Sequence, residues 1–142
     1  MEKNSSQSTS VTIPAHLQTF MAFDYGLKRT GVAIGNRITD TAQGLSTLKA
    51  EGSARWPLIE ARINEWQPDA IVIGVPYYKD GQTHDNTRRA QKFGRQLYAR
   101  YKLPVFEVDE RFSTTEALQM GAKDPDAAAA CIILEQFFRS LT

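Results

Sequence analysis

Short apolar runs along the chain alternate with amphipathic segments, and this pattern predicts an α/β domain. Residues 21–23 and 32–34 are apolar and flank a basic segment bracketed by two glycines, as in a β-hairpin. Residues 41–48 indicate a third strand at a sheet edge, although a central glycine weakens it. Residues 70–75 form a continuous apolar run typical of a strand buried on both faces. Residues 105–108 follow a proline and predict the last strand.

Helical spacing of apolar residues predicts the segments that connect the later strands. One helix is expected to begin at Ser53 and end before Pro68, with Trp56 and Trp66 facing the core. A second helix is expected at residues 86–101. Its inner stripe consists of four residues at helical spacing: Ala90, Phe93, Leu97 and Tyr101.

Two further helices are expected after the last strand. Ser113 and Glu116 form a capping-box pattern for a short helix that ends at Gly121. Asp124 is then the expected N-cap of a final helix, and Pro125 occupies its first position.

The order of these elements predicts an α/β domain with a five-stranded mixed sheet. Strands joined by hairpins should be antiparallel, whereas strands reached across a helix should run parallel to the first strand. Residues 1–18 are rich in Ser, Thr, Gln and Asn, and we expect them to form a flexible tail. The domain itself should then span residues 19–142.

Composition narrows the class of protein. The chain has 142 residues, of which 42% are hydrophobic and 23% charged, as in a soluble globular domain. Cys131 is the single cysteine, so no internal disulfide is possible. No apolar run approaches the roughly 20 residues of a membrane helix, and the first residues lack a signal-peptide core. We therefore expect a cytoplasmic protein with no membrane contact.

Three acidic residues stand where a functional site is expected. Asp24 ends the first strand, Glu110 ends the last, and Asp126 lies in the first turn of the final helix. The carboxyl ends of parallel strands meet at one sheet edge, where ligands bind in open α/β sheets. Carboxylates gathered there repel one another unless a cation neutralises them or one stays protonated. Their oxygen ligands suit Mg²⁺ or Mn²⁺.

Each acid also has a simpler interpretation. Asp24 could bond its own backbone in a turn, and Glu110 could pair with Arg111 on the surface. Asp126 could merely complement the helix dipole, an effect of about 0.3–1 kcal/mol. Asp109 could replace Glu110, because adjacent strand residues point to opposite faces.

Basic residues are unevenly distributed in a chain of net charge +1. Residues 79–102 contain seven basic residues against Asp80 and Asp85, which makes this segment +5. Arg88, Lys92 and Arg95 have i, i+4, i+7 spacing and should share a helix face that could follow phosphates or simply be solvated. The candidate nucleic-acid-binding residues are Lys28, Arg29, Arg88, Arg89, Lys92, Arg95 and Arg111.

Four segments within residues 20–138 resemble the YqgF/RuvX family of pre-16S rRNA nucleases and Holliday-junction-resolvase-like proteins. They are FDYGLKRTGVAIG, AIVIGVPYYKDG, VFEVDERFSTTEA and DPDAAAACIILEQFF. The resemblance implies a ribonuclease H-like fold with sheet order 3-2-1-4-5 and helices on both faces. It also implies an acidic triad of Asp24, Glu110 and Asp126. Asp124 competes with Asp126 for the last place, and the spacing to the following alanines favours Asp126.

These observations favour a metal-dependent nuclease that uses two Mg²⁺ or Mn²⁺ ions. The resemblance implies that it processes the 5′ end of precursor 16S rRNA during ribosome biogenesis, with pre-ribosomal particles as partners. The alternatives are a Holliday junction resolvase and a non-catalytic, nucleic-acid-binding assembly factor. A resolvase needs two dyad-related sites, and the chain shows no evident dimerisation segment. We therefore expect a monomer or weak homodimer acting on structured or locally unpaired RNA.

Overall fold

A five-stranded sheet forms the centre of the computed structural model, which describes residues 12–110 and 123–141. The strand order is β3-β2-β1-β4-β5, as expected. The strands are β1 (Thr19–Tyr25), β2 (Thr30–Asn36), β3 (Thr41–Leu48), β4 (Ala70–Val75) and β5 (Val105–Asp109). Hairpin connections make β1, β2 and β3 antiparallel, whereas β4 and β5 run parallel to β1. The predicted mixed sheet is therefore confirmed.

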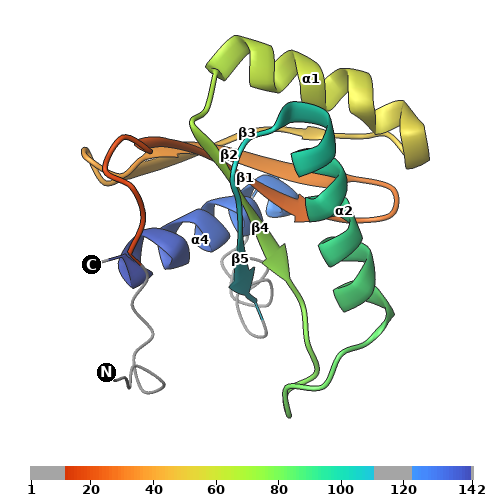
Figure 1. The fold of residues 1–142 in the computed structure, drawn as a ribbon. Coiled ribbons are helices and arrows are strands. Elements are labelled where there is room, and N and C mark those ends of the chain that lie inside the picture. Colours follow the sequence, from red (N-terminus) through yellow and green to blue (C-terminus); the bar gives the residue numbers. More distant parts are fainter. Residues whose placement is uncertain (1–11, 111–122, 142) are drawn as a thin grey trace.

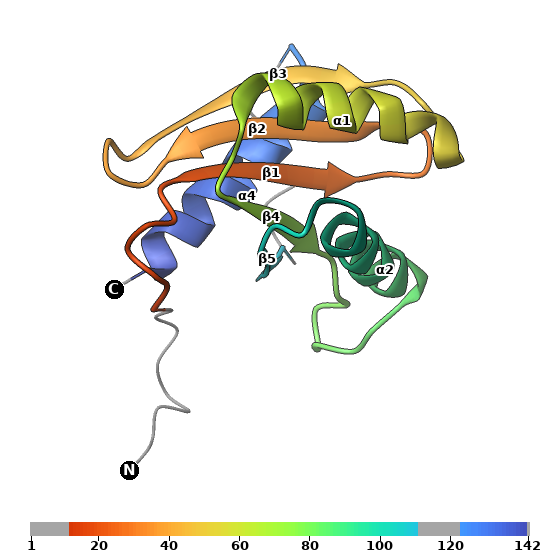
Figure 2. The ribbon, with the colours of Figure 1, turned by 45° about the horizontal axis from the view of Figure 1, so that its top comes forward.

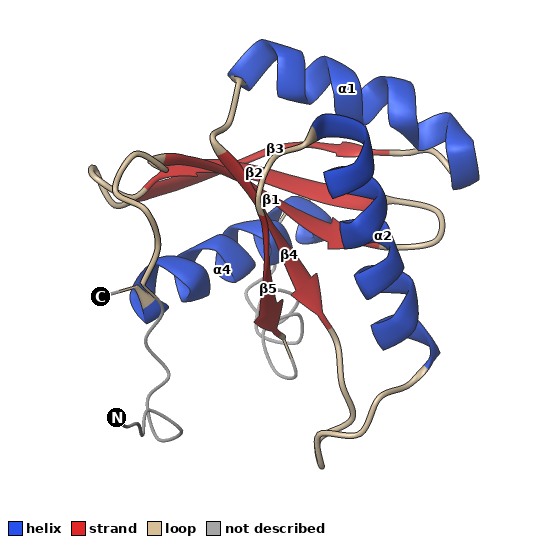
Figure 3. Cartoon of the chain, viewed as in Figure 1, coloured by secondary structure: helices blue, strands red, loops and turns tan. Residues whose placement is uncertain are grey.

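Helices cover both faces of this sheet, as Figures 1 and 2 show. The connections place α1 (Arg55–Trp66) and α2 (Asp85–Tyr101) on one face, and α4 (Pro125–Ser140) crosses the other (Figure 3). A short 3-10 helix, η2 (Gly52–Ala54), leads into α1. None of the helices in the described ranges is long and apolar enough to span a membrane.

Alternation along β1 separates the core into two clusters. Phe20 and Ala22 pack in the cluster under α4, whereas Met21 and Phe23 pack in the cluster under α1 and α2. Tyr25 joins the second cluster. Because strand side chains alternate between faces, the position between Phe23 and Tyr25 faces α4.

The predicted helices are confirmed where the structure describes them, with one correction to their packing. Trp56 packs against the core, but Trp66 is 37% exposed and does not face it. Trp66 is the last residue of α1 and lies beside Thr19 and Thr41, at the ends of their strands. The sheet stops there, so helical spacing alone could not bury this ring.

Two predicted segments lie partly or wholly outside the described residues. The short helix expected at residues 113–121 is one of them. Residues 1–18, expected as a tail, are described from residue 12, and Leu17 is only 4% exposed in the core under α4. The carboxylate of Asp69 accepts hydrogen bonds from the backbone N–H groups of Gln18 and Thr19, both at 2.9 Å. The chain is therefore fastened to the domain before β1 begins.

A buried arginine holds the β1–β2 turn against the start of α1. Arg55 is 3% exposed, and its guanidinium donates to the carbonyls of Gly26, Leu27 and Gly52 at 2.9–3.1 Å. It also donates to the Thr30 hydroxyl at 3.1 Å. A buried charge is tolerated only when its donors are satisfied, and here carbonyl dipoles satisfy them. The guanidinium also lies 4.5 Å from the centre of the Tyr25 ring.

We expect Arg55→Ala to lower the free energy of unfolding by about 2–4 kcal/mol, because three carbonyls of the β1–β2 turn and η2 lose a buried, charged donor. Arg37→Ala is the matched control, since the Arg37 guanidinium donates to the Pro14 carbonyl at 3.3 Å in an exposed position. Urea unfolding followed by circular dichroism measures both. Equal, small effects would show that the Arg55 bonds contribute little to stability.

Candidate metal centre

Asp24 lies at the carboxyl end of the central strand, on the face covered by α4. Its backbone is paired with Gly31 of β2, and Gly74 of β4 follows the Phe23–Ile73 pair on its other side. The carboxylate is therefore flanked by two residues without side chains. This leaves room above both neighbouring strands for groups from other elements.

The first turn of α4 fills the space above β2. A Cβ atom at Gly31 would overlap with the backbone oxygen of Asp126. Only glycine therefore allows the helix backbone to come so close to the strand. This close approach places Asp126 beside Asp24.

The side chain of Glu110 fills the space above β4. A Cβ atom at Gly74 would lie 2.7 Å from Glu110 Oε2 and would also overlap with the side chain of Ile133. The backbone N–H of Glu110 donates to the Val75 carbonyl at 3.2 Å, which extends the β4–β5 pairing by one residue. Glu110 is 8% exposed, and its Oε2 atom has no hydrogen-bond partner among the described residues.

The electrostatics of the two buried acids reflect this crowding. Burial, together with the charge of Asp126, raises the pKa of Asp24 to about 7. Burial and the charges of Asp24 and Asp109 raise the pKa of Glu110 to about 8. Without a cation, both carboxyls therefore hold their protons more tightly than free carboxyl groups do.

The donor set at this edge fits a hard divalent cation. Asp24, Glu110 and Asp126 offer only carboxylate oxygens, the ligands preferred by Mg²⁺ and Mn²⁺. The Oε2 atom of Glu110 has no hydrogen-bond partner among the described residues. A bound cation would supply the positive charge that this oxygen lacks. As placed within the described ranges, no three His, Cys, Asp or Glu side chains converge closely enough to hold an ion.

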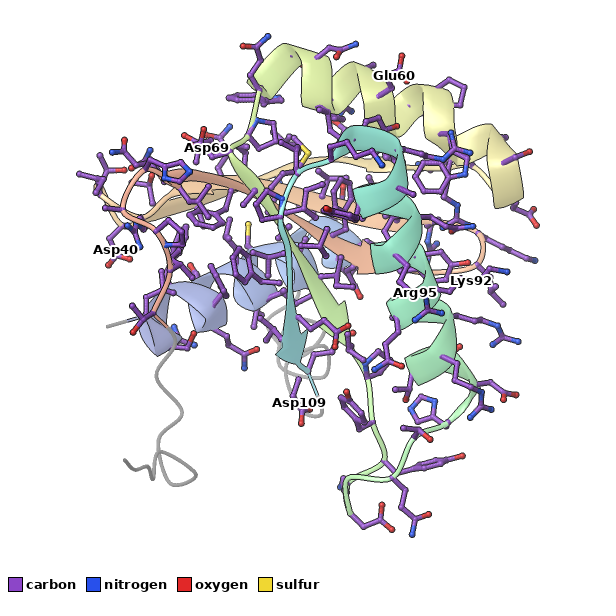
Figure 4. The ribbon with its side chains drawn as sticks, viewed as in Figure 1. Asp40, Glu60, Asp69, Lys92, Arg95 and Asp109 are labelled. Atoms are coloured by element: carbon purple, nitrogen blue, oxygen red, sulfur yellow. The ribbon has the colours of Figure 1, made fainter. Side chains whose placement is uncertain are left out.

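Asp124 and Asp109, the two acids that compete for places in the predicted triad, have surroundings different from those of the triad residues. Both oxygens of Asp124 are engaged: Oδ1 accepts from the Thr47 hydroxyl at 2.5 Å and the Ala127 N–H at 3.2 Å, and Oδ2 from the Thr47 N–H at 3.3 Å. Burial alone would raise the pKa of Asp124, but these hydrogen bonds outweigh burial and lower it. Asp124 caps α4, as expected. Asp109, at the end of β5, is exposed (Figure 4).

The candidate basic residues fall into separate groups. Arg29 Nε lies 3.0 Å from Asp126 Oδ2, and Lys28 is exposed on the same turn. On α2, Arg88 pairs with Asp85, and Arg89 donates to the Asn86 side chain at 2.9 Å. Another candidate, Arg111, lies outside the described residues.

Lys92 and Arg95, both exposed on α2, line different hollows of the surface (Figure 4). The hollow beside Lys92 also contains Arg89, whereas Arg95 lies beside Tyr98 and Glu107 near β5. Arg88, Lys92 and Arg95 of the predicted stripe therefore line different hollows, although their spacing puts them on one side of the helix. Sequence spacing could not show this, because it does not specify which element packs beside each turn of the helix.

Sequence reasoning missed the two glycines that bring the acids together. Gly31 and Gly74 look like ordinary small residues within strands. Gly31 is the residue paired with Asp24 on β2, and Gly74 follows the Phe23–Ile73 pair on β4. Once the sheet order is known, the signal that identifies these glycines is a small residue on each of the two strands beside a strand-end acid.

Comparison with known proteins gives consistent relatives. A family model described as RuvX, Holliday junction resolvase, matches residues 18–140. A Polaromonas protein named "Putative pre-16S rRNA nuclease" is 66% identical over 91% of this chain and 94% of its own length. An Albidiferax ferrireducens protein with the same name is 62% identical over 92% of this chain and 84% of its own length.

A solved structure of Thermus thermophilus RuvC with a Holliday junction substrate is 15% identical. The match covers 82% of this chain and 92% of that one, with a TM-score of 0.49. This likeness is too weak to support a conclusion about the function of this chain.

We expect stability in chelator to fall as the pH rises from about 4 to about 8. Asp24 and Glu110 bind protons more tightly in the folded protein than in the unfolded chain, because their folded-state pKa values are raised to about 7 and about 8. Folding thus becomes less favourable as these protons are lost. Asp24→Asn should raise the melting temperature at pH 8 and flatten this dependence.

Asp69→Asn is the matched control for that substitution. Backbone hydrogen bonds from Thr19 and Gln18 lower the pKa of Asp69, so its loss should destabilise the protein at pH 8. Thermal melts in chelator from pH 5 to pH 9 measure both variants. A wild type that gains stability over this range would contradict the proposed crowding of the acids.

Proposed function

The chain belongs to the RuvX family, and we propose on this basis that it is a metal-dependent nuclease that hydrolyses phosphodiester bonds in structured nucleic acid. The observation that carries the proposal is the placement of Glu110 and Asp126 over the glycines that flank Asp24. A purely structural role would not require a buried, unpartnered carboxylate oxygen at this point. We also propose that the protein is located in the cytoplasm.

Asp24, Glu110 and Asp126 would hold one or two Mg²⁺ or Mn²⁺ ions. When bound, such ions activate water and stabilise the leaving oxygen during phosphodiester hydrolysis. Asp24 is central because it lies between the other two acids. Glu110 is largely shielded from solvent, which strengthens its electrostatic interaction with a cation.

The basic turn beside the acids would orient the substrate. Arg29 is paired with Asp126 at 3.0 Å, yet its side chain is 62% exposed. Because the Arg29 guanidinium is accessible from solvent, a substrate phosphate could bind it in place of the Asp126 carboxylate. Lys28 lies on the same turn, exposed to solvent. The turn thus offers two positive groups next to a site that is otherwise negative.

Precursor 16S rRNA is the substrate we favour, with cleavage at its 5′ end and pre-ribosomal particles as the setting. The names of the Polaromonas and Albidiferax relatives support this choice. Holliday junction cleavage is the second candidate, favoured by the description of the family model. A non-catalytic assembly factor is the third, and it requires binding without cleavage.

We expect Asp24→Asn, Glu110→Gln and Asp126→Asn each to abolish metal-dependent cleavage while the protein remains folded. Asp109→Asn is the control, because this acid is exposed and lies next to Glu110 in the chain. Cleavage of end-labelled precursor rRNA with Mg²⁺, Mn²⁺ or chelator measures all four. Activity retained by Glu110→Gln but lost by Asp109→Asn would exchange the roles of these two acids.

We expect the wild-type protein to be a monomer or weak dimer that cleaves precursor rRNA rather than four-way DNA junctions. Paired symmetric cleavage of a junction requires two sites related by a dyad. Sedimentation velocity and a junction-nicking assay, run beside the rRNA assay, test this expectation. A tight dimer that nicks junctions symmetrically and leaves precursor rRNA intact would make the resolvase the better assignment.

A further inference from the structure

A positively charged groove lies on the face of the sheet opposite to the candidate metal centre. A groove of about 400 Å³ runs between α2, the start of α1 and the β1–β2 turn. Tyr25 lies at its base and packs with the core under α1 and α2, whereas the preceding residue, Asp24, faces α4. The groove is therefore adjacent to the candidate metal centre along β1 but separated from it by the sheet.

The groove concentrates positive charge. Four of its lining residues are cationic, and no acidic residue in the described ranges lines it. Those four are Arg55, Arg89, Lys92 and Arg100. The chain as a whole has a net charge of only +1, so this surface differs sharply from the average. A concave positive surface of this kind attracts polyanions.

The cations have different roles. Arg55 is buried and donates to backbone carbonyls and the Thr30 hydroxyl, so its main contribution to the groove is charge. Arg89, Lys92 and Arg100 are exposed, and none forms an ion pair with an acid in the part of the chain that the structure describes. These three residues are the ones available to a ligand.

Arg100 is held in position by an aromatic ring. Its guanidinium carbon lies 4.1 Å from the centre of the Trp56 ring. Such stacking orients the planar group while its N–H donors remain free for an acceptor. The ring of Trp56 also packs against Phe93 at 5.6 Å, so the platform under Arg100 belongs to the core.

The spacing of these three exposed cations indicates an extended ligand. Residues 89, 92 and 100 are related by steps of three and eight, which keeps them on one side of a helix. At 1.5 Å per residue, Arg89 and Arg100 are about 16 Å apart along the helix axis. One phosphate group cannot span this distance, whereas successive phosphates of a nucleic-acid strand can.

We propose that this groove binds the backbone phosphates of a single RNA strand that flanks the cleavage site. The proposal deepens the nuclease function and rests on it for the identity of the strand. The strand would pass around the end of β1, from the acidic face near Asp24 to the basic groove near Tyr25. Arg89, Lys92 and Arg100 would contact phosphates, and Arg55 would supply a fixed positive charge beneath them.

The test compares two pairs of substitutions. Lys92→Gln with Arg100→Gln removes two groove cations, and Arg37→Gln with Arg139→Gln removes two cations that lie outside the groove. Both pairs change the net charge equally. Binding of a fluorescein-labelled oligouridylate is measured by anisotropy in chelator, so that no cleavage is needed.

We expect the groove pair to weaken binding about tenfold and to flatten the log–log salt slope by about 1.4, which corresponds to two single-strand phosphate contacts. The control pair should leave both quantities near the wild-type values. Equal losses from the two pairs, or a slope unchanged by the groove pair, would overturn the proposal. Equally tight binding of polyglutamate would also overturn it, because the groove would then be a general anion surface.

A spectroscopic measurement locates the bound strand. The chain contains two tryptophans, and Trp66→Phe leaves Trp56 as the only one. Oligouridylate should change the fluorescence of Trp56 in this background, and Arg100→Gln should remove that change. If oligouridylate does not change the Trp56 fluorescence while precursor rRNA is still cleaved, the groove proposal is rejected and the nuclease function is not. Groove binding without any cleavage would instead reject the nuclease function.

Discussion

The close approach of backbone and side chain at two strand glycines is the constraint on which the candidate site depends. Gly31 lets the first turn of α4 rest on β2, and Gly74 leaves space for the carboxylate of Glu110 above β4. A side chain at either position would separate the acids that flank Asp24. The same contacts also seat α4 on the sheet, so the packing of the core and the geometry of the site cannot be altered independently.

This arrangement places opposing demands on the acidic residues. Asp124 contributes to the fold: its oxygens accept hydrogen bonds at the start of α4 and from β3, and they lower its pKa. Two residues further on, Asp126 is left to face Asp24 and Arg29. The burial of Asp24 and Glu110 instead raises their pKa values, so folding becomes less favourable as the pH rises unless a cation neutralises the carboxylates.

The central strand also joins two surfaces of opposite charge. Successive residues of β1 point to opposite faces, so Asp24 belongs to the acidic centre and Tyr25 to the basic groove. Arg55 fastens the turn between β1 and β2 from below and adds charge to the groove. A polyanion near this end of the sheet would therefore meet positive groups on one face and the proposed cation site on the other.

The sequence by itself determined the strands and the α4 cap, because these depend on local periodicity and short motifs. Its family resemblance implied the sheet order, and the assignment of the three acids as metal ligands stays a prediction from their placement along the chain and from that resemblance. Tertiary structure alone decided which acids are crowded, since that depends on the neighbours of Asp24 across β2 and β4. It also exposed Trp66 at the end of the sheet and placed the basic residues of α2 beside different hollows. Helical spacing specifies the side of a helix a residue occupies, but only packing determines what lies beside it.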